Sequence, residues 1–467
     1  MRLRLTTRLT TPTALLAVVA LCLSLTGCGS QLSPEEVRRA QGIAGGGDGT
    51  GTGDGSTDGG PQPGGGSTGD GPGGGSGPGS GGSKVKAGSC AGFKNTTGIS
   101  KSTIKIANAS DISGPVPGLM ESAQQGVKAY VAYFNSGQSI CGRKLELMNL
   151  DSRTDTAGDQ QSAIKACQEA FAMVGSLSAF DHGGAKAVSD CGIPDVRAAT
   201  VNATRQNAPT VYAANSVQVD EIPVVVPDYL KSKHPSAAKN AAFLYLNAGA
   251  AAANAKSWIA GWGKRGFRFT YTEGIETSEF NYSPYVTQMK NKGVKYVQFL
   301  GSYQHAVRLA KAMQQQSFKP DVFLLDPTGY NSNFVKSGGS AVDGVRVFTN
   351  SVLFEDPQTA EMRLYRGWLE RVAPGATPSY FGLFAWSAAR LFTEQALKLG
   401  GKLTRQSLLA AIRTVRAWTG HGLFAPQDVG GRHTAGCNSI IQLRNGKWVH
   451  ESKRYLCGSV LNTGVSG

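Results

Sequence analysis

The feature that most constrains the fold of this chain is an alternation of short apolar runs with amphipathic helical patterns. Runs typical of β-strands lie at 103–107, 144–150, 172–175, 241–246, 294–300 and 322–325. Helical patterns, in which apolar residues recur at i, i+3, i+4 and i+7, separate several of them, for example at 127–134, 162–171 and 306–313. Strands that alternate with helices are typical of parallel sheets covered on both faces. The sequence therefore predicts an α/β fold.

Residues 42–82 interrupt this pattern, because they contain 22 of the 62 glycines together with Ser, Thr, Asp and Pro and almost no apolar side chain. Such a segment cannot bury enough surface to offset its ordering entropy, so we expect a flexible tether. Two glycine motifs inside it, at 64–69 and 65–69, stand between no strand and helix and are coincidences of composition. The folded body is expected at 84–460, which leaves room for two lobes.

The N-terminus has a positive head, Arg2, Arg4 and Arg8, followed by an apolar run from Ala14 to Leu25. This run is too short to cross ~30 Å of hydrocarbon but suits a signal peptide. It ends in Leu-Thr-Gly before Cys28, which resembles a bacterial lipoprotein signal. We expect a signal peptide at 1–27, a lipid on Cys28, and a tether at 28–83 that holds the protein at the extracytoplasmic face of the cell membrane. The alternative is a soluble secreted protein cleaved nearby, with Cys28 free.

Export also explains the cysteines. Once Cys22 and Cys28 are set aside, six remain: Cys90, Cys141, Cys167, Cys191, Cys437 and Cys457. An even number in an oxidising compartment favours three disulfides, for which sequence alone allows fifteen pairings. Neighbours along the chain favour the pairs 90–141, 167–191 and 437–457. There is no C-x-x-C and no Cys/His zinc-finger spacing, so no metal site is expected.

The formal net charge of +15 does not indicate nucleic-acid binding. No basic run has aromatic residues interleaved with it, and an exported protein meets no nucleic acid. We interpret the charge as a basic surface that faces the anionic polymers or lipid headgroups of the cell envelope. Near the C-terminus, Asn445-Gly446 lies between two β-type runs and predicts a tight hairpin.

Candidate ligand-contacting loops follow the predicted strands, because open parallel sheets bind ligands beyond the carboxyl ends of their strands. These loops, at 113–115, 176–178, 198–200, 247–249, 301–303 and 326–328, carry hydroxyls, amides, one Tyr and one Asp. No nucleophile stands beside Asp181-His182, which we interpret as a helix-start Asp and a surface His. Trp258 and Trp262, at i and i+4, are interpreted as face packing rather than a ligand cage. The residues predict binding rather than catalysis, with no catalytic residue and no cofactor.

Three stretches resemble the branched-chain amino-acid type of periplasmic binding proteins. The first is 104–150, with Ser-Gly-Pro at 113–115 and Cys-Gly-Arg-Lys-Leu-Glu-Leu at 141–147. The others are 280–303 and the helix-like segment at 380–388. The resemblance, over about residues 100–450, implies the two-lobed type I fold, in which each lobe is a mostly parallel sheet flanked by helices and three hinge crossings join the lobes. Lobe 1 is expected at about 100–217 and 350–417, and lobe 2 at about 218–349 and 418–460.

The same resemblance implies a monomer that closes on a small-molecule ligand and delivers it to the permease of an ABC importer. Thr200 matches the family's carboxylate-binding Thr, Tyr303 its second-lobe aromatic residue, and Asp326 its second-lobe acid. Hydroxyls suit a carboxylate, and a buried acid suits an ammonium group. The full set of expected ligand-binding residues is Ser113, Ser176, Ser178, Thr200, Asp220, Asn247, Tyr303 and Asp326.

The sequence also departs from the family pattern. Ala179 occupies the position of the family's carboxylate-binding Ser, and Ser178 stands beside it. Gln218 occupies the position of the family's first-lobe acid, and Asp220 follows two residues later. Leu119 stands where an aromatic residue is expected. The ligand is therefore expected to be an amino acid or a related amide or organic solute, without a commitment to one.

Purely structural roles remain alternatives for the site residues. Asp326, Thr200 and Ser178 are then helix caps, and Tyr303 is a packing residue. Three other functions also stay open. They are a ligand-sensing receptor of the same fold, a surface enzyme and a wall-structural lipoprotein.

Overall fold

The computed structural model describes residues 85–465. The predicted signal peptide at 1–27 and tether at 28–83 lie outside these residues. Within 85–465, no helix combines the length and the hydrophobicity that crossing a bilayer requires.

The first sheet is built by the N-terminal half of the described chain. Its five strands are all parallel and lie in the order β2-β1-β3-β4-β5. Their bounds are β1 Thr103–Ser110, β2 Lys144–Asp151, β3 Ala172–Val174, β4 Asp195–Ala199 and β5 Val211–Asn215. The runs predicted at 103–107, 144–150 and 172–175 are confirmed as β1, β2 and β3.

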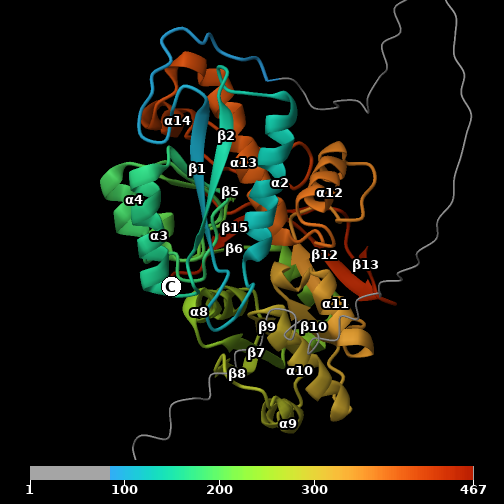
Figure 1. Ribbon diagram of the computed structural model, residues 1–467. Coiled ribbons are helices and arrows are strands. Elements are labelled where there is room, and N and C mark those ends of the chain that lie inside the picture. Colours follow the sequence, from blue (N-terminus) through green and yellow to red (C-terminus); the bar gives the residue numbers. More distant parts are fainter. Residues whose placement is uncertain (1–84, 466–467) are drawn as a thin grey trace, which may run out of the picture. The chain divides into compact units, whose positions relative to one another are not determined.

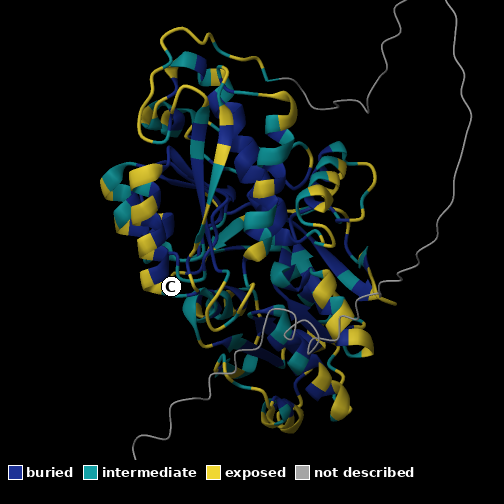
Figure 2. Cartoon of the chain, in the orientation of Figure 1, coloured by how far each residue is buried: buried dark blue, intermediate teal, exposed yellow. Residues whose placement is uncertain are grey.

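Helices cover both faces of this sheet (Figure 1). The helices packed against or beside it are α2 Glu121–Gly137, α3 Thr156–Glu169, α4 Ala185–Cys191, α5 Ala203–Gln206, α12 Ala360–Val372, α13 Tyr380–Leu399, η3 Gly400–Lys402 and α14 Arg405–Ile412. Helix α3 starts earlier than the predicted 162–171, because the Asp155 carboxylate caps it by accepting the Gly158 N–H at 2.6 Å. Strands β3, β4 and β5 are buried throughout, whereas the edge strand β2 and the helices α3 and α4 carry exposed residues, which are yellow in Figure 2.

The central helix of this half is α13, which packs along α2 at short distance. A Cβ atom added to Gly126 would lie 2.3 Å from the Gly382 carbonyl oxygen, so only glycine permits this approach. Around the contact, the Trp386 ring packs edge-on against Tyr130 with centroids 5.0 Å apart. The Tyr130 hydroxyl lies 2.6 Å from the Thr393 hydroxyl. Residues 380–399, distant in sequence from the first sheet, thus complete its core.

The second sheet has eight strands and runs β13-β12-β11-β10-β9-β7-β8, with β14 paired to β12. Strands β7 to β11 are parallel, and β12 to β14 are antiparallel. The bounds are β7 Ala241–Leu246, β8 Phe269–Ile275, β9 Tyr296–Leu300, β10 Val322–Leu325, β11 Arg346–Thr349, β12 Cys437–Arg444, β13 Lys447–His450 and β14 Leu456–Cys457. The predicted hairpin is confirmed between β12 and β13, where Asn445 and Gly446 both take positive φ values of 51° and 75°.

The second sheet also has helices on both faces. On one side lie α6 Val225–Lys233, α7 Pro235–Ala238 and α8 Gly249–Lys264. On the other lie α9 Ser283–Asn291, α10 Tyr303–Gln315, η1 Pro327–Gly329, α11 Ser332–Gly338 and η2 Gly339–Val342. A separate two-stranded ribbon pairs β6 Glu221–Pro223 with β15 Val460–Asn462. Each sheet with its helices is called a lobe below.

The chain passes between the two lobes three times, after β5, after β11 and before β12. Buried side chains tie the crossings together. The Asn215 amide donates to the Tyr380 hydroxyl at 3.1 Å, and this hydroxyl donates to the Asn350 Oδ1 at 2.9 Å. The Asn350 amide in turn donates to the Asn215 Oδ1 at 3.1 Å. This closed triangle, called the hinge triangle below, joins the first and second crossings to α13.

The structure contains the three disulfides that chain order favours: Cys90–Cys141, Cys167–Cys191 and Cys437–Cys457. The first fastens the segment before β1 to the loop before β2. The second joins the end of α3 to the end of α4, and the third pairs β12 with β14.

Candidate functional site

A cavity of about 590 Å³ lies between the two lobes. Its lining residues include Thr200 after β4, Asn215 at the end of β5, Tyr303 after β9, Asp326 after β10 and Asn350 after β11. All five stand at or just beyond the carboxyl ends of parallel strands, which is where open α/β sheets bind ligands. The volume is in the range of pockets that enclose small organic molecules.

The ionisable side chains of the cavity wall are unusual. Among the described residues, its carboxylates are Glu121, Glu221 and Asp326, and no Lys, Arg or His lines it. The remaining wall consists of hydroxyls, amides and many aliphatic or aromatic side chains. The cavity therefore differs from the surface of a chain whose formal net charge is +15.

Asp326 is a buried acid of this wall. It follows β10 directly and is only 7% exposed. Its carboxylate accepts from the Thr328 hydroxyl at 2.6 Å and caps the 3₁₀ turn η1. Burial raises the pKa of Asp326 to about 7, although the Thr328 hydrogen bonds oppose the shift. Near neutral pH this side chain can therefore either donate a proton in a hydrogen bond or carry a negative charge.

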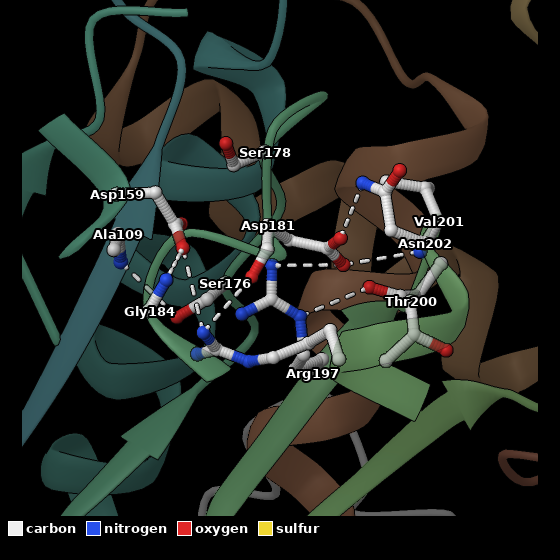
Figure 3. Close-up of polar contacts among 12 residues, drawn as sticks. Ala109, Asp159, Ser176, Ser178, Asp181, Gly184, Arg197, Thr200, Val201 and Asn202 are labelled. Carbon is white, nitrogen blue, oxygen red and sulfur yellow. Dashed lines mark hydrogen bonds and ion pairs between the residues drawn. The ribbon is translucent and has the colours of Figure 1, made fainter. Parts of the chain in front are cut away.

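The first-lobe edge of the cavity is fixed by buried ions (Figure 3). The Asp181 carboxylate accepts from the Val201 backbone N–H at 3.0 Å and from the Asn202 amide at 2.7 Å. Arg197, fully buried on β4, lies 3.7 Å from Asp181 and 3.2 Å from Asp195. This chain of contacts sets the backbone next to Thr200.

A second pair of buried ions extends the network. The Arg205 guanidinium lies 2.7 Å from the Asp195 carboxylate and 3.4 Å from Asp159. Asp159 also accepts from the Gly184 N–H at 2.7 Å, and burial raises its pKa to about 6. We call Asp159, Asp181, Asp195, Arg197 and Arg205 the rim network. Its members are each at most 1% exposed, so they act on the cavity by holding loops and not by touching a ligand.

Helix α8 of the second lobe makes direct hydrogen bonds to the first lobe at this edge. The Ala250 N–H donates to the Ala179 carbonyl at 3.0 Å. The Asn254 amide donates to the Val201 carbonyl at 3.0 Å. Ala179 is itself held by Asp111, whose carboxylate accepts the Ala179 N–H at 2.7 Å. Both acceptors for α8 thus belong to loops that buried carboxylates fix.

The family model described as periplasmic binding protein matches residues 103–447. The chain belongs to this family. No curated protein matches its sequence.

Solved structures show the same two-lobed fold at low sequence identity. The fatty acid ABC transporter substrate-binding protein from Thermomonospora curvata has a TM-score of 0.67 and 16% identity, covering 79% of this chain and 96% of that one. LivJ from Streptococcus pneumoniae is a branched-chain amino acid transporter substrate binding protein solved with isoleucine. It has a TM-score of 0.64 and 16% identity, and the match covers 76% of this chain and 100% of LivJ. A solute binding protein from R. palustris in complex with 4-hydroxybenzoate has a TM-score of 0.65 and 15% identity, and the match covers 76% of this chain and 97% of that one. The resemblance and the fold predicted from the sequence are confirmed.

Three of the eight predicted ligand residues line the cavity of this periplasmic binding protein: Thr200, Tyr303 and Asp326. Thr200 is 6% exposed, and Tyr303 is half-buried at the first position of α10. Burial raises the pKa of the Tyr303 hydroxyl, which therefore stays protonated and able to donate.

The three predicted serines hold first-lobe loops and do not line the cavity. Ser113 is exposed, and its hydroxyl donates to Asp151 at 2.6 Å. The buried Ser176 hydroxyl accepts from the Ala109 N–H at 3.1 Å, as Figure 3 shows. Ser178 is buried and accepts from the Phe180 N–H at 3.2 Å.

Asp220 and Asn247 also lie outside the cavity wall. Asp220 accepts from the Asn462 amide at 2.9 Å, next to the β6–β15 ribbon. Asn247 is exposed and donates to Glu276 at 2.9 Å. Both side chains stabilise connections of the second lobe.

Two interpretations from the sequence are corrected. Asp181 is not a helix-start residue: it precedes α4 by four positions and is buried against Arg197, because β4 brings a cation beneath its loop. Trp258 and Trp262 do pack, but they also line the cavity. Their i, i+4 spacing placed them on one face of a helix, and only the fold shows that this face borders the cavity.

Proposed function

We propose that this chain is an extracytoplasmic solute-binding lipoprotein of an ABC importer. It captures a small ligand, an amino acid or a related amide or organic solute, between its two lobes. The observation that carries the proposal is the cavity of about 590 Å³, bounded by the carboxyl ends of parallel strands from both sheets, and three crossings join these sheets. A cavity between two linked lobes is the arrangement that hinge closure around a ligand requires.

Binding begins on the first lobe. The ligand meets the loop around Thr200, whose position the rim network fixes, and the second lobe then closes with Tyr303 and Asp326. Closure forms the α8 contacts from Ala250 and Asn254 to the first lobe. A ligand that touches both lobes binds the closed state more tightly than the open one and so shifts the population toward it.

The polar end of the ligand is held by Thr200, Tyr303 and Asp326. Hydroxyls from the first two suit a carboxylate or amide, and Asp326 suits an ammonium or amide group. Relatives solved with isoleucine and with 4-hydroxybenzoate support a ligand that combines one polar end with an apolar body.

A thermal-shift screen against amino acids, short amides, sugars and aromatic acids tests the binding function. Because ligand held only by the native state stabilises it by RT ln(1 + [L]/Kd), the matching class raises Tm by several degrees. Thr200→Ala and Asp326→Asn reduce this shift. Ser113→Ala, a matched hydroxyl outside the cavity, leaves it unchanged. Equal shifts in all three variants contradict the proposed site.

Anchoring and delivery have their own tests. Cys28→Ala moves the protein from the membrane fraction to the soluble fraction, and retention in the membrane contradicts the lipid anchor.

Deletion of the gene for this protein abolishes cellular uptake of the radiolabelled ligand if the protein serves an importer, whereas unchanged uptake favours a sensing role.

A further inference from the structure

The cavity continues from the interlobe cleft into the second lobe, beneath helix α8. The α8 residues that border it include Ala250, Asn254, Trp258 and Trp262, each four positions from the next. This spacing places them in one stripe along the helix. At 1.5 Å per residue the stripe is about 18 Å long.

The inner part of the cavity, which we call the α8 chamber, is lined by Ile222, Val226, Trp258, Trp262 and Phe348. These residues come from β6, α6, α8 and β11, on the side of the second sheet that α8 covers. Ile222 and Trp262 are each 3% exposed, and Val226 is 2% exposed. The second lobe therefore encloses this part of the cavity wall, which is not a surface groove.

The walls of the chamber are fixed by aromatic packing. The Trp258 and Phe348 rings lie 5.4 Å apart, and the Trp262 ring lies 4.8 Å from Phe267 and 5.8 Å from Tyr296. Asp326 stands elsewhere, at the end of β10 in the cleft. Glu221 lies beside Ile222 on β6, where its carboxylate accepts the Thr434 backbone N–H at 2.9 Å. A wall of this kind offers water few hydrogen-bond partners but gives full contact to methylene groups.

We propose that the α8 chamber holds the linear aliphatic chain of an amphiphilic ligand whose polar end stays in the cleft near Asp326. This inference rests on the proposed function and names its ligand class. A free amino acid is a single residue, which extends only ~3.6 Å along the backbone plus one side chain, so it fills a small part of the 18 Å stripe. The chain also contacts the helix that closes on the first lobe through Asn254, so filling the chamber favours closure.

Chain length provides the first test. Purified protein is titrated with saturated carboxylic acids, primary amides and n-alkylamines of increasing length. Each buried methylene strengthens binding about fourfold (about 0.8 kcal/mol) until the chamber is full. Val226→Phe shortens the preferred chain and Trp258→Leu lengthens it. Affinity independent of length in all three series overturns the inference, and a short solute that still raises Tm would then leave the proposed function standing.

Tryptophan fluorescence locates the chain. Of the six tryptophans, Trp258 and Trp262 line the cavity. A chain brominated at its far end quenches their emission more than a chain brominated beside the polar group. The quenching disappears in Trp258→Phe/Trp262→Phe and persists in the control Trp368→Phe, whose residue packs on Tyr133 outside the cavity. Equal quenching by the two isomers places the chain outside the chamber and contradicts the proposal.

Discussion

The first lobe meets the cavity with loops held by buried ions, whereas the second lobe meets it with the apolar wall beneath α8. In the first lobe, Arg197 and Asp181 fix the backbone beside Thr200 without touching the cavity. In the second, Trp258 and Trp262 form the wall themselves. The difference indicates that buried ion pairs set the backbone of the first-lobe edge, whereas aromatic packing sets the part of the wall beneath α8.

The largest expected effect comes from breaking the rim network. Arg197→Met leaves the buried Asp181 and Asp195 carboxylates without this cation, so we expect the free energy of unfolding to fall by about 3–5 kcal/mol. Denaturant titration measures it. The control is Asp190→Ala, which removes an exposed pair with Lys186 and costs at most about 0.5 kcal/mol. Equal losses in the two variants would show that the buried ions do not stiffen the first lobe.

The pH dependence of the free energy of unfolding tests the burial of Asp326 in the second lobe. The pKa of Asp326 rises from 3.8 to about 7 on folding, so the folded state binds more protons than the unfolded state between these values. The stability of the ligand-free protein therefore falls as pH rises from about 4 to about 7, by up to about 4 kcal/mol. Asp326→Asn reduces this slope in denaturant titrations at several pH values, and the part that remains comes from groups such as Asp159, whose pKa burial raises to about 6. The exposed variant Asp190→Asn keeps it, and a slope unchanged in Asp326→Asn would contradict the assignment.

The hinge triangle joins the two lobes, and Tyr380→Phe removes the hydroxyl shared by Asn215 and Asn350. Leaving their buried polar atoms without this partner costs about 1–3 kcal/mol of unfolding free energy. Tyr282→Phe is the matched control, because that buried hydroxyl has no hydrogen-bond partner within the described residues. A larger loss from Tyr282→Phe than from Tyr380→Phe would refute the role of the triangle.

The smallest expected effect lies where the lobes touch. Asn254→Ala removes one hydrogen bond between the lobes. If the lobes close on the ligand, ligand affinity weakens by about threefold to tenfold, while the stability of the ligand-free protein stays nearly constant. Isothermal titration measures the affinity. Lys256→Ala, exposed on the same helix, is the control. Unchanged affinity in Asn254→Ala would mean that this contact forms in the open state as well.

Sequence reasoning predicted the elements that local chemistry determines. The strand β7 at Ala241–Leu246 and the hairpin at Asn445-Gly446 both follow from residue type and spacing. The same reasoning placed Thr200, Tyr303 and Asp326 in loops that follow strands, and all three lie in the cavity wall.

The remainder depends on partners distant in the sequence. Arg197 looks out of place in the apolar β4, and only the fold supplies Asp181 and Asp195 as its buried partners. The same holds for Trp258 and Trp262, whose shared face borders the cavity because β6 and β11 come to lie opposite. Hydroxyls such as Ser176 satisfy backbone groups inside the lobe, a demand that sequence does not reveal.

Small-angle X-ray scattering of the purified protein, with and without the ligand that gives the largest thermal shift, tests the central claim most directly. If the two lobes close on a solute, the radius of gyration falls on binding, and Asn254→Ala needs more ligand to reach the same value. Scattering curves that coincide at saturating ligand would contradict closure as the mechanism of this protein.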